Sequence, residues 1–368
     1  MDKNQLRKMM QHNAASTLKL KKRLIARWAT GTGKSGILLD FLSHNPEVKK
    51  VLILVPETNN IENWTVEFNK FNVSMEGVEI VCYASLKNYT DTSWDLLCLD
   101  EAPHTNTDLR LGALDTVASK YVLALGAVVS EEEEEMLTMI YGTFSSSTIS
   151  LDMAIQSGIL PSPVVKVCHM SLDNTRLRYL YDGCTKTALG VYHAIENKVK
   201  AATQAYNTNS SVYNKRRMLR LGSERKRFLG EQKTNAMAYI CDQLNQRGKR
   251  FLCFCSSIAQ AQKLGGDNAF TSKTPSSMKV LDKFNNHEIN SLFVVGKLIE
   301  GQNLNDIDCG VIGQLGGKER ITTQSIGRIM RSDSPVIYVP VFDGTKDDGF
   351  MHSLTSSISK QYIKHYNL

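Results

Sequence analysis

The sequence predicts an α/β protein in which two parallel-sheet lobes are joined by a helical, basic linker or insertion. Short apolar segments alternate with segments of helical periodicity from about residue 21 to residue 160, and the alternation resumes at residue 234. Strands and helices that alternate in this way form a parallel sheet with helices on both faces. The stretch from about residue 172 to 233 is rich in Lys, Arg, Tyr and Asn and shows no convincing strand. We therefore expect a first lobe at residues 1–160, a linker at 161–233 and a second lobe at 234–368.

Length and composition agree with this organisation. The 368 residues suit two domains of about 150 residues plus a connection. A hydrophobic content of 42% with 22% charged residues is ordinary for a globular protein with a sizeable core. The longest uncharged apolar run, Tyr121–Val129, is too short to cross a bilayer, and the first residues lack the apolar stretch of a secretory signal. We expect no membrane association, a cytoplasmic location and reduced cysteines.

Individual elements follow from the apolar runs. Val51–Pro56 is uncharged throughout, which is typical of a strand that is buried on both faces and ended by proline. In the first lobe we expect strands at 23–26, 51–56, 78–83, 96–99 and 121–125, and helices at 36–42 and 61–71. The linker is predicted as helical with a polar break at 207–210. The second lobe is predicted to hold a helix at 234–246 and strands at 250–255, 291–295, 309–312 and 336–339.

A glycine-rich turn lies between the first strand and the first helix of the first lobe, and it reads Ala29-Thr30-Gly31-Thr32-Gly33-Lys34-Ser35. Phosphate binding needs successive backbone N–H groups that point inward, which glycines and a helix N-terminus provide. Lys34 would neutralise the β- and γ-phosphates, and the Ser35 hydroxyl would coordinate Mg²⁺. Trp28 stands where the full G-x-x-x-x-G-K-[ST] pattern has its first glycine, so the match is partial. The turn predicts a nucleotide site, and an incidental loop is the alternative.

Two carboxylates follow the apolar run Leu96–Leu99. Asp100 would hold Mg²⁺, directly or through water, and Glu101 would orient and deprotonate the attacking water. An acidic turn at the end of a strand is common in α/β proteins and is the alternative interpretation. The pairing with the glycine-rich turn favours the functional one.

Two arginines at helical spacing occur nearly three hundred residues later, in Gln324-Ser325-Ile326-Gly327-Arg328-Ile329-Met330-Arg331. Arg328 and Arg331 would share one helix face and could stabilise the charge that develops on a γ-phosphate. An isolated Arg-x-x-Arg is more often a surface feature, and only the accompanying Gln324 and Gly327 strengthen the prediction.

Basic residues are concentrated between Lys215 and Lys233, although the net charge of +7 alone neither requires nor excludes a polyanionic partner. Such a stripe could follow a phosphate backbone, and Arg216, Arg217 and Arg220 are its candidate contacts. A solvated helix face explains these residues equally well.

Together these segments resemble the superfamily 2 helicases and translocases, especially compact phage-type and restriction-enzyme-type members. Ala29–Ser35 resembles motif I in its "ATGTGK" form, in which a residue other than glycine at the Trp28 position is usual. Asp100-Glu101-Ala102 resembles motif II. Gln324–Arg331 matches motif VI, Q-x-x-G-R-x-x-R.

Further motifs of the family are found in the expected order. Gln11 corresponds in position to the adenine-reading glutamine. The other matches are Leu52–Thr58 for motif Ia, Tyr83–Leu86 for the motif that follows it, Phe254–Ser257 for motif IV and Glu300-Gly301-Gln302-Asn303-Leu304 for motif V. The resemblance therefore spans about residues 11–331.

The resemblance implies two RecA-like lobes that bind ATP and Mg²⁺ between them and contact a single nucleic-acid strand. Glu300 and Gly301 would contact the nucleotide. Thr58, Ser85, Ser256 and Ser257 would meet phosphates of the strand, although each could equally cap a helix. The resemblance favours DNA over RNA, a monomer, replication, recombination or repair proteins as partners, and a phage origin with a location in the host cytoplasm.

The sequence departs from the family pattern at two places. Motif II should continue with histidine after Ala102, but Pro103 intervenes and His104 comes one place later. Motif III, usually Thr-Ala-Thr or Ser-Ala-Thr, is Gly126-Ala127-Val128. In the family these side chains help to couple hydrolysis to strand movement. The residues for hydrolysis itself are all present, so we expect hydrolysis and leave the coupling open.

Two classes of function follow. The leading hypothesis is an ATP-dependent DNA helicase or translocase. The second is a binding or remodelling subunit that hydrolyses ATP and switches conformation without unwinding. A packaging-type or unrelated P-loop ATPase is a weaker third, since motifs V and VI would have no role in it.

Overall fold

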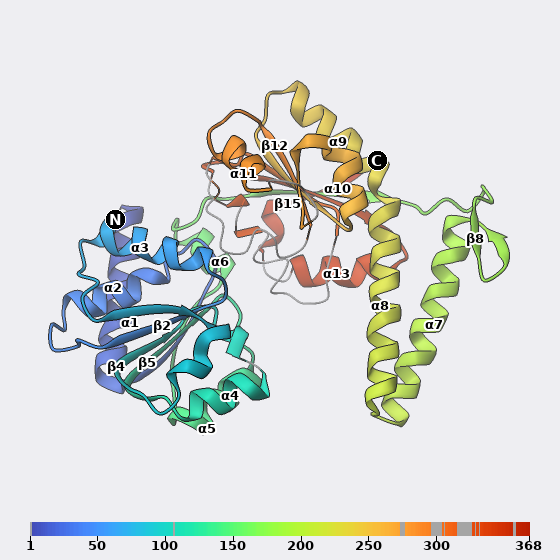
Figure 1. The fold of residues 1–368 in the computed structure, drawn as a ribbon. Coiled ribbons are helices and arrows are strands. Elements are labelled where there is room, and N and C mark those ends of the chain that lie inside the picture. The colour runs from blue at the N-terminus through green and yellow to red at the C-terminus, as the bar shows by residue number, and fades with distance from the viewer. Residues whose placement is uncertain are drawn as a thin grey trace. The chain divides into compact units, whose positions relative to one another are not determined.

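The computed structural model describes residues 2–105, 107–272, 277–295, 304, 306–314, 326–327, 329–330, 332–355 and 358–368. The chain divides into two compact units, one built on Met1–Ser162 and the other on Pro163–Ile299 and Asn305–Leu368. Each unit is organised around its own parallel sheet (Figure 1). The prediction of two parallel-sheet lobes with a helical connection is confirmed.

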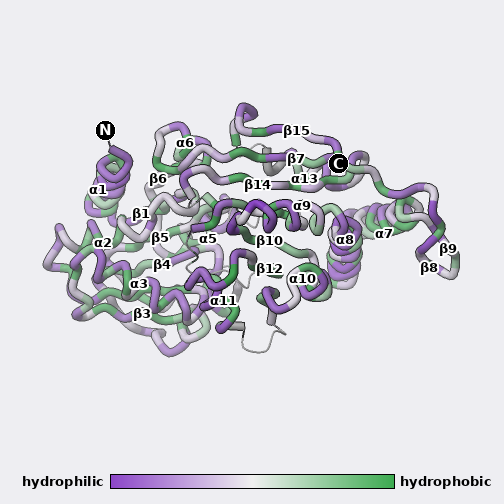
Figure 2. Tube along the Cα trace, turned by 90° about the horizontal axis from the view of Figure 1, so that it is seen from above, coloured by the Kyte–Doolittle hydropathy of each residue, from purple (hydrophilic) through white to green (hydrophobic). Residues whose placement is uncertain are grey.

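The sheet of the first unit has six strands in the order β3-β2-β4-β5-β1-β6, and every neighbouring pair is parallel. Its central strands are apolar because helices cover both faces. Figure 2 shows hydrophobic residues along β4 and β5. The strands are β1 (Arg23–Trp28), β2 (Val51–Val55), β3 (Val78–Cys82), β4 (Ser93–Leu99), β5 (Ala118–Gly126) and β6 (Ser145–Ile149).

Helices complete the first unit on both sides of this sheet (Figure 1). They are α1 (Lys3–Lys21), α2 (Ser35–Ser43), α3 (Asn59–Phe71), α4 (Asp108–Asp115), α5 (Glu131–Tyr141) and α6 (Leu151–Gln156), with 3-10 turns η1 (Tyr83–Tyr89) and η2 (Ala102–Thr105). On one face, Leu114 of α4 and Leu137 of α5 pack against Leu97 and Leu99 of β4. On the other face, α1 contacts β1 and β5, and Phe41 of α2 meets the ring of Tyr121 edge-on.

The sheet of the second unit has seven parallel strands in the order β11-β12-β10-β13-β14-β7-β15. The strands are β7 (Val164–Met170), β10 (Phe251–Cys255), β11 (Ala269–Phe270), β12 (Ser291–Val295), β13 (Cys309–Ile312), β14 (Val336–Phe342) and β15 (Ile363–Asn367). The helices around them are α9 (Thr234–Gln246), α10 (Ile258–Gly265), α11 (Ser277–Asn285) and α13 (Lys346–Thr355), with 3-10 turns η3 (Gly266–Asn268) and η5 (Lys360–Tyr362). Apolar residues of α9 pack against β10 and β13.

A hairpin of two long helices projects from the second unit. The helices α7 (Ala188–Thr208) and α8 (Val212–Gln232) pack along their length through an apolar seam that includes Val191, Ile195 and Leu221. The break between them, 209–211, falls at the predicted polar segment. Sequence reasoning missed the small antiparallel hairpin of β8 (Tyr179–Tyr181) and β9 (Cys184–Lys186), because its strands are short and exposed. It also missed β7, which lies within residues 161–233 and pairs with β14.

The helical hairpin is fastened to the second unit by buried contacts at the end of α8. Lys233 lies between α8 and α9, and its Nζ is 2.8 Å from Oδ2 of Asp347 on α13. Both side chains are almost fully buried, with 1% and 3% exposed. Gly230 packs directly on Ser256, where any side chain on the glycine would collide.

No helix among the described residues combines the length and the apolar character needed to cross a bilayer. All eight cysteines are free, and six of them are buried, as predicted for core thiols.

Candidate functional site

The candidate site lies at the carboxyl edge of the first sheet. Because all six strands are parallel, the segments that follow them emerge at the same edge. The glycine-rich turn follows β1, Asp100 and Glu101 follow β4, and Gly126 ends β5. Motifs that are far apart in the sequence are thus brought to one rim of the sheet.

The backbone of the glycine-rich turn requires its two glycines. Gly31 and Gly33 have φ angles of 88° and 90°, a region that side chains with a Cβ rarely occupy. The turn leads directly into α2, which begins at Ser35. The N-terminal N–H groups of a helix lack partners within the helix and favour an anion. The structure therefore has the loop-to-helix geometry that binds phosphate groups.

The two threonines of the turn differ in their surroundings. The Thr32 hydroxyl is fully buried and donates to the Ala29 carbonyl at 2.7 Å, which closes the turn on itself. The Thr30 hydroxyl is shielded from solvent, yet it has no hydrogen-bond partner among the described residues. Since a buried polar atom without a partner costs free energy, Thr30 is the better candidate for a ligand contact.

Gln11 supports the turn from α1. Its side chain is 3% exposed, and its Nε2 donates to the Gly33 carbonyl at 2.8 Å. A Cβ on Gly33 would come within 2.8 Å of the same amide, and a Cβ on Gly36 would overlap it. In this structure Gln11 therefore holds the turn, and the adenine-reading role stays a prediction.

The charged residues of motifs I and II lie next to one another. Nζ of Lys34 is 3.8 Å from Oε1 of Glu101, and both side chains are partly shielded from solvent. Glu101 has a φ angle of 49°, in the left-handed region that is uncommon for residues other than glycine. The strand thus ends in a sharp turn immediately after Asp100. Such strained positions cluster at functional sites.

The electrostatics of Asp100 are unusual for an aspartate. Burial away from water is the main cause that raises the pKa of Asp100 to about 6, and the negative charge of the neighbouring Glu101 carboxylate is the second. A hydrogen bond from Trp64 and the charge of Lys34 oppose this pKa shift but do not cancel it. A carboxylate that is costly to ionise in the protein is suited to a cation that would neutralise it.

The raised pKa predicts a pH-dependent effect of Asp100→Asn on stability. A carboxyl group whose pKa is higher in the folded state contributes stability at low pH, and this contribution is lost as the pH rises through about 6. The variant should therefore match the wild type near pH 4 and be more stable near pH 8, by roughly 1–3 kcal/mol. Denaturant unfolding of both proteins at the two pH values measures this difference. An equal difference at both pH values would show that the pKa of Asp100 is ordinary.

Two side chains of α3 complete the site, and sequence reasoning missed both. Nε1 of Trp64 donates to Oδ2 of Asp100 at 2.9 Å, and the Ser35 hydroxyl donates to Oε2 of Glu67 at 3.1 Å. Donation by Ser35 leaves its oxygen lone pairs available to a cation. The available signal was the three-residue spacing of Trp64 and Glu67, which places both on one face of a helix that follows motif Ia.

The two departures from the family pattern are close to each other in space. A Cβ on Gly126 would lie 2.8 Å from Cγ2 of Val129 and 3.4 Å from Cδ of Pro103. The ring of His104 stacks on that of Tyr83, whose hydroxyl donates to the Asp100 carbonyl at 2.9 Å. Tyr83 therefore links the His104 ring to the backbone of Asp100.

The residues predicted to contact nucleic acid have different local roles. Thr58 is exposed at the start of α3, and its side chain makes no capping hydrogen bond; Ser85 is half-buried in η1. The Ser257 hydroxyl caps α10 by accepting from the Gln260 N–H at 3.2 Å, and the Ser256 hydroxyl donates to Oε1 of Gln260 at 2.8 Å. Both serines thus have local structural partners.

Arg216, Arg217 and Arg220 are exposed on α8, and no acidic side chain pairs with them within the described part of the chain. By contrast, Arg225 on the same helix pairs with Glu196 of α7 at 2.6 Å. Five predicted site residues lie outside the described residues: Glu300, Gly301, Gln324, Arg328 and Arg331.

Comparison with known proteins is informative at the level of structure. No family model and no curated protein matches the sequence. The chain is similar to the Hef helicase domain of Pyrococcus furiosus, with a TM-score of 0.56 and 14% identity over 95% of this chain and 97% of that one. It is also similar to the Sulfolobus solfataricus SWI2/SNF2 ATPase core in complex with dsDNA, with a TM-score of 0.39 and 13% identity over 93% of this chain and 88% of that one.

The parallel sheets define an α/β protein, and its glycine-rich turn leads from β1 into the N-terminus of α2. Its fold is similar to that of the Hef helicase domain, and this likeness confirms the two-lobed fold that the motif resemblance implies.

Proposed function

We propose that this protein hydrolyses ATP in a nucleic-acid-dependent manner and acts as a helicase or translocase. The observation that carries the proposal is the proximity of Lys34 and Glu101, 3.8 Å apart, beside Asp100 with its raised pKa. Transfer of a phosphoryl group to water requires three protein groups: a cation that contacts the phosphates, a carboxylate that binds Mg²⁺ and a carboxylate that accepts a proton from the water. An acidic turn without a functional role would not need a lysine beside its two carboxylates, so the arrangement favours the functional interpretation.

The described residues fit a nucleotide with Mg²⁺. The turn offers backbone N–H groups at a helix N-terminus and the unpartnered hydroxyl of Thr30. Ser35 and Asp100 are oxygen ligands of the kind that Mg²⁺ prefers, and Trp64 and Glu67 hold them in place. When bound, Mg²⁺ would neutralise negative charge on the phosphate oxygens.

Each protein group then has a definite task. Lys34 attracts the negative charge of the phosphates and stabilises the charge that grows during transfer. Glu101 accepts a proton from the attacking water. From the sequence, we infer that Arg328 and Arg331 add further positive charge and that Gln324 assists them. We also infer nucleotide contacts for Glu300 and Gly301 and strand contacts for Thr58 and Ser85.

ATPase measurements test the proposal. Hydrolysis rates are compared without nucleic acid and with single-stranded DNA, duplex DNA, forked DNA and RNA. We expect stimulation, with DNA more effective than RNA, and displacement of a labelled strand from the fork. Hydrolysis that no nucleic acid changes would refute the nucleic-acid-dependent function.

One observation favours the second function, an ATP-switched binding or remodelling subunit. The departures at Pro103 and Gly126 occupy the region that couples hydrolysis to movement in the family, and they pack close together. Stimulated hydrolysis without strand displacement or translocation would support this alternative.

The exposed arginines of α8 are proposed to bind the phosphate backbone. Changing Arg216, Arg217 and Arg220 to alanine should weaken binding. It should also make the fall of the logarithm of the binding constant with the logarithm of salt concentration less steep by about 2–3, since each phosphate contact contributes about 0.7–0.9. Fluorescence anisotropy with labelled DNA over a range of salt concentrations measures the slope. The control changes three exposed lysines, Lys263, Lys283 and Lys364, to alanine. Equal slopes for both variants would exclude the proposed contacts.

A further inference from the structure

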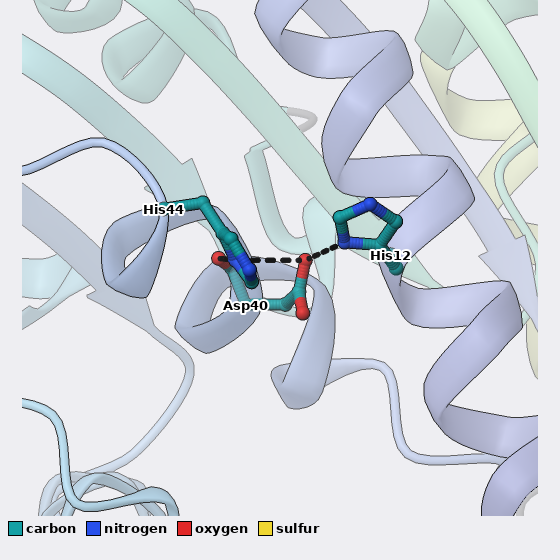
Figure 3. Close-up of side chains that lie close together, drawn as sticks. All are labelled: His12, Asp40 and His44. Carbon is teal, nitrogen blue, oxygen red and sulfur yellow. Dashed lines mark hydrogen bonds and ion pairs between the residues drawn. The ribbon is translucent and has the colours of Figure 1, made fainter.

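A cluster of two histidines and one aspartate lies on the surface of the first unit, outside the candidate nucleotide site. His12 comes from α1, whereas Asp40 lies on α2 and His44 is the residue that ends it (Figure 3). Oδ2 of Asp40 is 3.0 Å from Nδ1 of His12 and 3.6 Å from Nδ1 of His44. The single carboxylate oxygen therefore stands between two imidazole nitrogens.

The spacing of these atoms matches a metal site. Ligands at about 2.0–2.1 Å from a tetrahedral zinc ion are about 3.3–3.4 Å from one another. The two measured separations lie on either side of this value, and one ligand atom from each residue lies within 4.8 Å of the others. Asp40 and His44 are four residues apart, a spacing that places two ligands on one side of a helix. Nδ1 of His44 also lies 2.9 Å from the Asp40 carbonyl oxygen, a contact that a bound ion would replace.

The surroundings leave room for an ion and its water. The cluster lies in a surface hollow of about 420 Å³ between α1 and α2. The side chains of His12 and His44 are 54% and 59% exposed, so an ion can reach them, while Asp40 is more shielded. Lys19, the cation in the same hollow, is paired with Glu47.

A second histidine cluster in the chain shows that such proximity alone is insufficient. His169 places its Nδ1 2.6 Å from Asp343 and its Nε2 2.8 Å from His365. The two contacts use opposite nitrogens of one ring, so the three groups do not converge on a point. Among the described residues, only His12, Asp40 and His44 bring three possible ligand atoms within 4.8 Å of one another.

We propose that His12, Asp40 and His44 bind a divalent transition metal, with Zn²⁺ as the best match, and that water fills the remaining position. Two imidazoles and one carboxylate favour zinc and its neighbours over Mg²⁺, which prefers oxygen ligands. The ion would link α1 to α2. This link would adjoin Gln11, whose amide holds the turn at Gly33, and would restrain the two helices that frame the turn. The proposal does not depend on the proposed ATPase function.

Zinc binding by the full chain, without a histidine tag, tests the proposal. After removal of metal with EDTA, equilibrium dialysis should show one saturable Zn²⁺ site per chain that an excess of Mg²⁺ does not displace. His12→Ala combined with His44→Ala should abolish this site, and Asp40→Asn should weaken it about tenfold or more. Co²⁺ in place of Zn²⁺ should give the visible absorption of a four-coordinate ion in the wild type and not in the double variant.

Controls separate this site from other histidines and from misfolding. His193→Ala removes an exposed imidazole of α7, and His365→Ala disrupts the second cluster. Both variants should retain the site, and Zn²⁺ should raise the Tm of these proteins and the wild type but not that of the double variant. Because His12 and His44 are exposed, the metal-free double variant should keep the Tm of the metal-free wild type. Absence of saturable binding in the wild type, or its retention in the double variant, would overturn the proposal.

Discussion

Lys34→Ala is expected to lower kcat for ATP hydrolysis by about a thousandfold or more, which corresponds to about 4 kcal/mol of transition-state stabilisation. Among the described residues, the ammonium of Lys34 is the one positive charge that pairs with Glu101, at 3.8 Å. Its loss would leave the negative charge that develops on the phosphates without this partner. It would also remove a charge that lowers the pKa of Asp100, so that Asp100 would be protonated at a higher pH. Steady-state phosphate release measures the effect.

The control for this experiment is Lys21→Ala, which removes an exposed lysine from the last turn of α1. This variant should hydrolyse ATP at the wild-type rate. Circular dichroism and the Tm establish that Lys34→Ala remains folded. Turnover within tenfold of the wild type in a folded Lys34→Ala protein would contradict the assignment of the nucleotide site.

Lys233→Met is expected to destabilise the protein by about 3–5 kcal/mol, because it leaves the carboxylate of Asp347 buried without its cation. The carboxylate also accepts from the Phe342 N–H at 3.1 Å, so it cannot turn easily toward solvent. Lys233 stands between α8 and α9, and the ion pair therefore contributes to fixing the helical hairpin on the second unit. Denaturant unfolding monitored by far-ultraviolet circular dichroism measures the loss.

A double variant and an exposed pair sharpen this test. Lys233→Met with Asp347→Asn should lose less stability than Lys233→Met alone, since the amide oxygen still accepts from Phe342 and no charge stays buried. The exposed pair Lys198–Asp182, 2.7 Å apart in the same part of the chain, gives the comparison. Lys198→Met should cost less than about 1 kcal/mol. A similar small cost for Lys233→Met would show that the buried pair adds little.

The sequence predicted every central strand of the two parallel sheets except β7, and of their four edge strands it predicted only β3. Val51–Val55 lies between two neighbours and is buried on both faces, so its continuous apolar run identifies it. Ser145–Ile149 and Ile363–Asn367 are edge strands whose outward residues are polar. Their pairing is decided by neighbours distant in the sequence, which a local pattern does not contain.

The same distinction applies to the site. Lys34 and Glu101 are identifiable because phosphate chemistry fixes both their residue types and their sequence context. Trp64 and Glu67 act by positioning Asp100 and Ser35, and many residue types at many places on a helix could perform that task. Only the packing of α3 beside α2 at this end of the sheet selects them. The local contacts of Ser256 and Ser257 likewise depend on Gln260, which no motif includes.

The contacts around Gly126 constrain how this protein could evolve. A change of Gly126 to serine would place the new β-carbon 2.8 Å from Cγ2 of Val129 and 3.4 Å from Cδ of Pro103. The Val129 side chain must therefore move before position 126 can accept a β-carbon, whereas Pro103 is already close to an ordinary contact distance. A smaller residue at position 129 should widen the choice of side chains at position 126.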